Sequence, residues 1–404
     1  MFLSGASTLS MRDPVDHVRR YTRQSEFEFV GWTLESISIK LGQFSLGVTE
    51  YLTEEERVAL VLDYFVMLNQ FQQVERELEN VLSDPTNTDP SSEASSLREQ
   101  TLELRSELDR IQPLVETILQ EQVAVVLSDF GLGIGGKIIP SVAFKFSQLP
   151  VTLIVSPREV IRMDANIPLV TNLTIDQKIM LEDQVAQDLD VSSLIVNIGG
   201  IGLYPTMVLE SSSLRWIVET IVHEWVHNYL TLRPLGLSYE KNAELRTMNE
   251  TVASLLGEEF GYFVLERYYP EFAPDREITP PTTTVPSTDP PKFDFRAEMH
   301  ETRIKADQLL AQGLIEEAEA YMEERRQFIW ENGYRIRKLN QAYFAFHGAY
   351  ADAPQGAAGE DPVGKAVREY WAQLDSPVDF LIRMSWMDQF SDLERALEEL
   401  NPTP

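Results

Sequence analysis

The stretch SLRWIVETIVHEWVHNYL at 213–230 predicts one amphipathic helix that carries two of the chain's histidines. His223 and His227 are four residues apart, so both imidazoles project from one face, one turn above the other. That spacing lets two nitrogens reach a single tetrahedral zinc ion. Apolar residues at helical spacing form the stripe expected to be buried: Leu214, Ile217, Ile221 and Trp225.

Glu224 follows the first histidine directly and is the candidate general base. On a helix it is rotated by about 100° from His223, which places its carboxylate beside a water bound to the metal. The carboxylate can take a proton as zinc lowers the pKa of that water, and then pass it to the leaving amine. The alternative is a purely structural role, in which two hydrogen-bonded histidines lie in a helical core with a surface glutamate between them. Because the chain has only five histidines, the HExxH pattern rarely arises by accident.

A third protein ligand should come from a different element. The segment NETVAS at 249–254 is expected to open a second helix, with the turn between the two helices at 235–237. HEWVH followed by NETVA resembles the gluzincin metallopeptidases, in which a glutamate on a later helix completes the metal site. The resemblance implies one zinc ion per chain, held by His223, His227 and Glu250, with Glu224 as general base. The acidic residues that rival Glu250 as ligand are Glu244, Glu258 and Glu259.

The resemblance extends to a later segment. RKLNQA at 337–342 and then Tyr350 resemble the L-N-N-A…Y segment of aminopeptidase-like bacterial proteins of this clan. This implies that Tyr350 donates to the oxyanion opposite the metal, where a second donor is needed. His347 is the alternative donor, or else a packed histidine among the aromatic residues at 343–346. Ser254 departs from the pattern, because many gluzincins carry there an aspartate that orients a zinc-binding histidine.

The remaining chain divides into regions of different character. Apolar residues at helical spacing over 58–82 and 97–118, joined by a polar connection, predict an antiparallel hairpin that contacts the body or a protein partner. Between 123 and 210 the β-branched runs VAVVL, VTLIV and SSLIVNIGGIGLYPTMVL predict short strands. Residues 199–208 are expected to form an edge strand that a peptide could join, or to break at Pro205.

The glycine cluster GLGIGGK at 131–137 satisfies a dinucleotide pattern and most of a phosphate loop. Either site would require a helix that opens directly after the glycines. Here Ile138 stands where a magnesium-binding Ser or Thr belongs, and Pro140 argues against a helix. A glycine-rich turn is therefore the better interpretation, with nucleotide binding as the weaker one.

The composition excludes several classes of function. The chain has 34 basic and 64 acidic residues, a formal charge of −30, which repels nucleic acid and anionic lipid surfaces. There is no cysteine, so a transition metal must be bound by His, Asp or Glu. We find neither a signal peptide nor an apolar stretch long enough to span a bilayer.

Together these observations predict a mixed α/β (α+β), helix-dominated protein with a zincin-like catalytic core, a small sheet and an N-terminal helical hairpin. The expected activity is zinc-dependent hydrolysis of peptide bonds in a peptide or protein substrate, by an aminopeptidase or an endopeptidase. The alternative is a non-catalytic interaction protein on a metallopeptidase scaffold. The expected regions are 1–122 (N-terminal helical), 123–278 (core with the metal helices), 279–292 (Pro/Thr-rich loop or linker) and 293–404 (C-terminal helical, completing the cleft).

Overall fold

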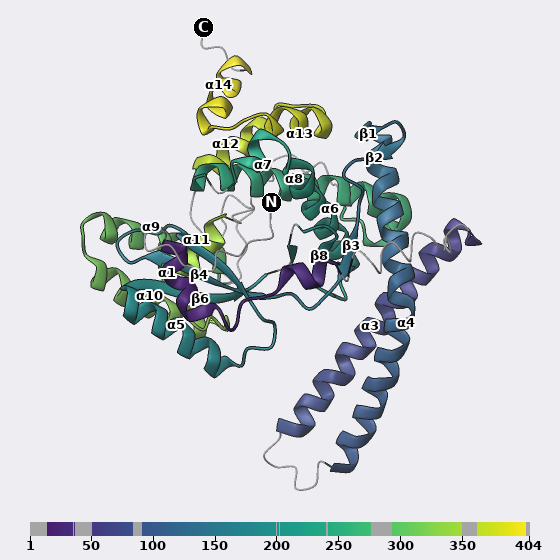
Figure 1. Cartoon of the computed structure of the whole chain (residues 1–404), viewed down its shortest axis with the longest axis horizontal. Coiled ribbons are helices and arrows are strands. Elements are labelled where there is room, and N and C mark those ends of the chain that lie inside the picture. The colour runs from purple at the N-terminus through teal and green to yellow at the C-terminus, as the bar shows by residue number, and fades with distance from the viewer. Residues whose placement is uncertain are drawn as a thin grey trace, which may run out of the picture.

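The computed structural model describes residues 14–34, 36, 51–83, 91–198, 200–201, 203–239, 241–275, 293–349 and 362–400. Over these ranges helices dominate and the sheets are small, so the expectation of a helix-dominated mixed α/β fold is confirmed. Figure 1 shows a long helical hairpin projecting from a body in which helices surround the strands. The Pro/Thr-rich stretch at 279–292 lies outside the described residues. No helix within the described ranges combines the length and apolar character needed to cross a membrane.

The hairpin consists of α3 (Glu54–Ser83) and α4 (Ser91–Asp129), which pack along each other. The predicted helices are confirmed, and both are longer than expected. A capping box starts α3: the Thr53 hydroxyl accepts from the Glu56 amide at 3.2 Å, and the Glu56 carboxylate accepts from the Thr53 amide at 2.8 Å.

The prediction of a strand at VAVVL is wrong, because residues 123–127 are the last turns of α4. Val123, Val126 and Leu127 are buried at helical spacing, in the same core as the helix that carries the histidines. Burial of three side chains outweighs the small penalty that β-branched residues bring to a helix. The boundary expected at 122 therefore falls inside a continuous helix.

The larger sheet has the order β5-β4-β6 and is antiparallel throughout. Its strands are β4 (Val151–Pro157), β5 (Ala165–Leu169) and β6 (Val191–Asn197), so the predictions for VTLIV and SSLIV are confirmed. Leu153 pairs with both flanking strands and faces α1 (Pro14–Thr22) and α5 (Ile175–Leu189). Ile154 points to the other face, where Phe346 of α11 (Gln341–Ala349) covers it.

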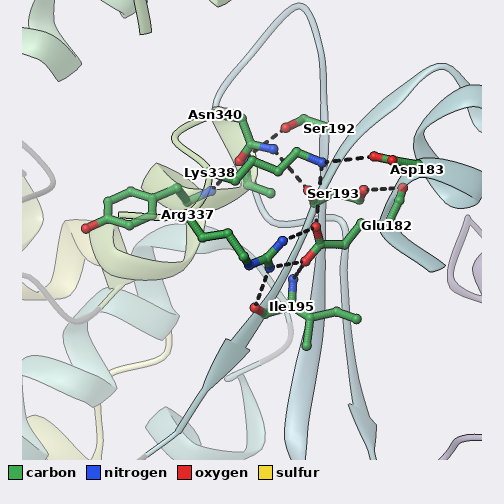
Figure 2. A network of polar contacts seen from close by, with 10 residues as sticks. Glu182, Asp183, Ser192, Ser193, Ile195, Arg337, Lys338 and Asn340 are labelled. Atoms are coloured by element: carbon green, nitrogen blue, oxygen red, sulfur yellow. Dashed lines mark hydrogen bonds and ion pairs between the residues drawn. The ribbon is translucent and has the colours of Figure 1, made fainter. Parts of the chain in front are cut away.

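Hydrogen bonds to the buried carboxylate of Glu182 join the segment before α11 to the edge strand β6 (Figure 2). Glu182 of α5 accepts from Arg337 at 2.8 Å and from the backbone amide of Ile195 at 2.6 Å. Asn340 donates to the Ser193 carbonyl at 3.0 Å and caps α11 by accepting from the Tyr343 amide, also at 3.0 Å. Within the segment that resembles the gluzincins, Arg337 and Asn340 thus hold a helix on a sheet.

The second sheet lies beside the histidine-bearing helix and has the order β3-β8-β7. Its strands are β3 (Phe144–Phe146), β7 (Gly200–Ile201) and β8 (Thr206–Val208), and the chain leaves the sheet around Pro205, as predicted. The expectation of one edge strand over 199–208 holds only for β7. Because β3 pairs in parallel with β8, that second strand is central.

The glycine cluster forms a tight turn, as predicted. Strands β1 (Gly133–Ile134) and β2 (Lys137–Ile138) pair across Gly135 and Gly136, both of which have positive φ. Glycine adopts this backbone conformation without strain. A strand rather than a helix follows the glycines, so the geometry that a phosphate loop needs is absent from this described segment.

Two helices carry the candidate site: α6 (Leu214–Leu230) and α8 (Ala243–Tyr268), joined through the short α7 (Pro234–Leu237). The Ser213 hydroxyl caps α6, and the predicted apolar stripe is buried. At Gly257 the two helices approach closely, since a Cβ there would lie 2.9 Å from the Glu219 carbonyl oxygen and 3.2 Å from the His223 Cβ. Asn242 caps α8, so this helix begins at Ala243, six residues before the Asn249 that was expected to open it.

The remaining helices complete the body. The helices α9 (Phe295–Ala311) and α10 (Ile315–Glu331) pack together beside α11, and a single 3-10 turn at Pro270–Phe272 ends α8. The helices α12 (Pro362–Trp371), α13 (Pro377–Ser385) and α14 (Phe390–Leu400) all contact α8. The helix that offers the third ligand is therefore packed against α6, α4 and the C-terminal helices, which hold it in place.

Candidate metal centre

Three side chains from α6 and α8 converge on one point. The Nε2 atoms of His223 and His227 are 3.0 Å apart. The Oε2 atom of Glu250 lies 3.5 Å from the first and 3.4 Å from the second. Within the described ranges, no other three His, Asp or Glu side chains converge in this way. The rival ligands Glu244, Glu258 and Glu259 are not part of the group.

The hydrogen bonds around the group turn three possible ligand atoms toward one another. The Asn249 Oδ1 atom lies 2.8 Å from His227 Nδ1, so that nitrogen carries the hydrogen and Nε2 is free to act as a ligand. Glu250 Oε2 is buried and has no hydrogen-bond partner. Three such atoms so close repel one another unless a proton or a metal cation lies between them. Bonds of 2.0–2.2 Å in a tetrahedral zinc site place ligand atoms about 3.3–3.6 Å apart. Both distances from Glu250 to the histidines fall in this range and the distance between the histidines, 3.0 Å, is slightly shorter, so small shifts would let the three residues hold zinc.

Each of the three converging side chains has a second polar partner. His227 has Asn249, and His223 has Ser254, whose Oγ lies 3.5 Å from Nδ1. Glu250 accepts a hydrogen bond at 2.6 Å from the hydroxyl of Tyr239. Such outer partners fix ring orientation and ligand basicity. Ser254, at the position where many gluzincins carry an orienting aspartate, is thus the polar partner of His223.

The electrostatics of the group favour a bound cation. Burial alone would lower the pKa of His227, but the negative charge of Glu250 outweighs it and raises that pKa to about 9. Burial opposes ionisation of Glu250, yet the charges of His227 and His223 hold its pKa well below the usual range. At neutral pH the metal-free group therefore retains a proton, which a metal ion must displace.

Glu224 is buried and close enough for its charge to interact with the three converging residues. Burial raises the pKa of its carboxyl, the two histidines lower it and Glu250 raises it further. A carboxylate with a raised pKa accepts a proton more readily at neutral pH.

The two candidate oxyanion donors differ in what the structure describes. His347 packs with its ring centroid 4.2 Å from that of Tyr343 and 5.1 Å from that of Phe346, and burial lowers its pKa to about 4. That packing agrees with the alternative of a core histidine. Tyr350 lies outside the described residues.

No sequence pattern predicted a role for Tyr239 or Asn249, and at Ser254 the sequence showed only that the orienting aspartate of many gluzincins is missing. Ser254 lies four residues after Glu250 on the same face of the helix, and Asn249 directly precedes Glu250 in the chain. That spacing was the available signal for both. Tyr239 lies in the connection between α7 and α8, where no periodicity predicts the direction of a side chain.

Scans of protein-family models, curated proteins and solved structures find no match to this chain.

We expect Glu250→Ala to weaken zinc binding by more than about 100-fold. Loss of an outer-shell partner alone typically costs 10–100-fold, and here a ligand oxygen is removed. Competition titration with a zinc-binding dye measures the change. Glu258→Ala is the matched control, since Glu258 lies on the same helix, is exposed and is outside the converging group. Unchanged affinity in Glu250→Ala, or a loss in Glu258→Ala, would place the third ligand elsewhere.

Proposed function

We propose that the chain is a zinc-dependent hydrolase of peptide bonds with a zincin-like core. The observation that carries this proposal is the convergence of His223 Nε2, His227 Nε2 and Glu250 Oε2 on one point, with the buried Glu224 beside it. Three protein ligands are the number that catalytic zinc sites use, which leaves one position for water or substrate. The resemblance of 223–227 and 249–253 to the gluzincins supports peptides as the substrate class.

The roles of the residues follow from their surroundings. Zinc held by His223, His227 and Glu250 would supply a Lewis acid that polarises a substrate carbonyl and lowers the pKa of water. Asn249 fixes the tautomer of His227 that leaves Nε2 without a hydrogen, and Ser254 is the polar partner of His223 Nδ1. Glu224 accepts the proton of the attacking water and transfers it to the leaving nitrogen.

The strand β7 adds a surface on which a substrate could align. It is the edge of the second sheet and contacts α6. The side-chain amide of Asn228, next to His227, donates to the Leu203 carbonyl at 3.1 Å and to the Thr206 hydroxyl at 3.0 Å. These bonds hold the connection between β7 and β8 against the helix. An extended peptide adding to β7 would thus run along α6, the helix that carries the two histidines.

The test is a joint measurement of zinc content and peptide cleavage. We expect purified protein to contain one zinc per chain by elemental analysis and to cleave members of a mixed peptide library. Removal of zinc with 1,10-phenanthroline should abolish cleavage, and one equivalent of zinc should restore it. Absence of bound zinc, with no thermal stabilisation on adding zinc, would disprove the assignment.

The alternative is a non-catalytic interaction protein whose working surface is the projecting hairpin of α3 and α4 (Figure 1). This alternative requires no general base, whereas Glu224 is present and buried at the site. Full zinc occupancy without cleavage of any library member would favour it over the hydrolase.

A further inference from the structure

Tyr239 makes the connection between the two metal-site helices part of the site itself. Its hydroxyl donates to Glu250 Oε1 at 2.6 Å. Its ring lies edge-on to the ring of His227, with 6.3 Å between centroids, and the Arg246 guanidinium lies over it at 5.6 Å. The aromatic ring thus contacts one proposed ligand and hydrogen-bonds another.

The backbone that leads into Tyr239 is held by hydrogen bonds to α7. The Tyr239 amide donates to the Gly236 carbonyl at 3.2 Å, and the Ser238 amide donates to the Pro234 carbonyl at 3.0 Å. Leu235 is fully buried, and a Cβ on Gly236 would overlap the backbone at Leu230. The turn before Tyr239 therefore cannot shift without disturbing the end of α6, and the phenol reaches Glu250 from this turn.

We infer that Tyr239 is a positioning residue that gives the two carboxylate oxygens of Glu250 different roles; the inference rests on the proposed function. Oε1 is occupied by the phenol, whereas Oε2 faces the two histidines without a hydrogen-bond partner. The hydrogen bond keeps Oε1 away from the metal, so the glutamate binds through Oε2 alone. Such ligation preserves a four-coordinate site with one position for water.

Removal of the Tyr239 hydroxyl should change the number or placement of the metal's ligands as well as the affinity for zinc. In Tyr239→Phe, the buried Oε1 loses the donor that holds it and can approach the metal. The carboxylate then binds through both oxygens or rotates away from its present position. Either change alters the number or placement of ligands, and zinc affinity should fall by about 10–100-fold, as for other outer-shell partners.

Cobalt(II) placed in the zinc site reports coordination directly, because four-coordinate cobalt absorbs visible light more strongly than five-coordinate cobalt. We expect Tyr239→Phe to weaken the cobalt absorption and to raise the Kd for zinc by about 10–100-fold. Tyr262→Phe is the matched control: Tyr262 donates to Glu266 at 2.8 Å on the same helix α8, at an exposed position. It should leave the spectrum and the Kd unchanged.

A double-mutant cycle tests whether Tyr239 acts through Glu250. In the Glu250→Ala background, Tyr239→Phe should cause no further loss of zinc affinity, since its partner is absent. Additive losses would overturn the inference. So would equal losses of melting temperature in metal-free and zinc-loaded Tyr239→Phe with an unchanged Kd and cobalt spectrum, which is the signature of a purely structural role. A wild-type chain that binds no zinc would overturn the proposed function and this inference together, whereas normal zinc binding by Tyr239→Phe overturns the inference alone.

Discussion

His223→Ala is expected to lose its zinc during purification, with a Kd at least about 100-fold weaker than that of the wild type. The estimate is a lower bound, because loss of an outer-shell partner alone costs 10–100-fold. The variant leaves two protein ligands, one fewer than catalytic zinc sites use. Elemental analysis after dialysis and a competition titration give occupancy and affinity.

The choice of His223 keeps the effect on folding small. Its removal leaves His227 beside Glu250 at 3.4 Å and in contact with Asn249, so the buried carboxylate retains a positive partner. His227→Ala should also lose zinc, but it leaves Glu250 buried with its main partner gone, and unfolding could then obscure the result. His223→Ala is therefore the cleaner variant.

His17→Ala is the matched control, since His17 lies on α1 beside the other sheet and outside the converging group. It should keep one zinc per chain. Wild-type zinc content in His223→Ala would show that this histidine is not a ligand, and the proposed metal centre would be wrong.

The sequence predicted α6 well because every signal for it is local. The apolar stripe, the Ser213 cap and the two histidines lie within one helix, and spacing alone relates them. The approach of Glu250 is a different kind of prediction. It came from a resemblance, and in the structure it depends on the close packing of α6 and α8 at Gly257.

The errors have a common physical origin in tertiary contacts. The run at 123–127 has strand-forming residues, yet packing of Val123 and Leu127 into the main core makes it helical. The central position of β8 depends on its parallel pairing with β3, across about sixty residues of chain that no local pattern connects. Tyr239 was missed for the same reason, because its partner Glu250 belongs to the next helix.

Glu224→Gln should keep its zinc and lower kcat for peptide cleavage by about 10²–10⁴-fold, the usual contribution of a general acid or base. The amide has nearly the shape of the carboxylate but cannot accept a proton. Because Glu224 is buried among the charges of the site, the neutral amide should not destabilise the fold. Zinc content, melting temperature and kcat are measured on one preparation.

Glu219→Gln makes the same change one turn before His223 on α6, at a carboxylate that accepts from Arg215 at 2.6 Å. Glu219→Gln should retain both zinc and turnover. The comparison then shows that the loss in Glu224→Gln comes from the place of Glu224 at the site and not from the removal of a negative charge from α6. If Glu224→Gln lost zinc, the carboxylate would be supporting the metal rather than the reaction. If it kept zinc and cleaved peptides at the wild-type rate, proton transfer would have to be assigned to another group. Only a zinc-loaded, folded and inactive Glu224→Gln agrees with a base that acts after the metal is in place.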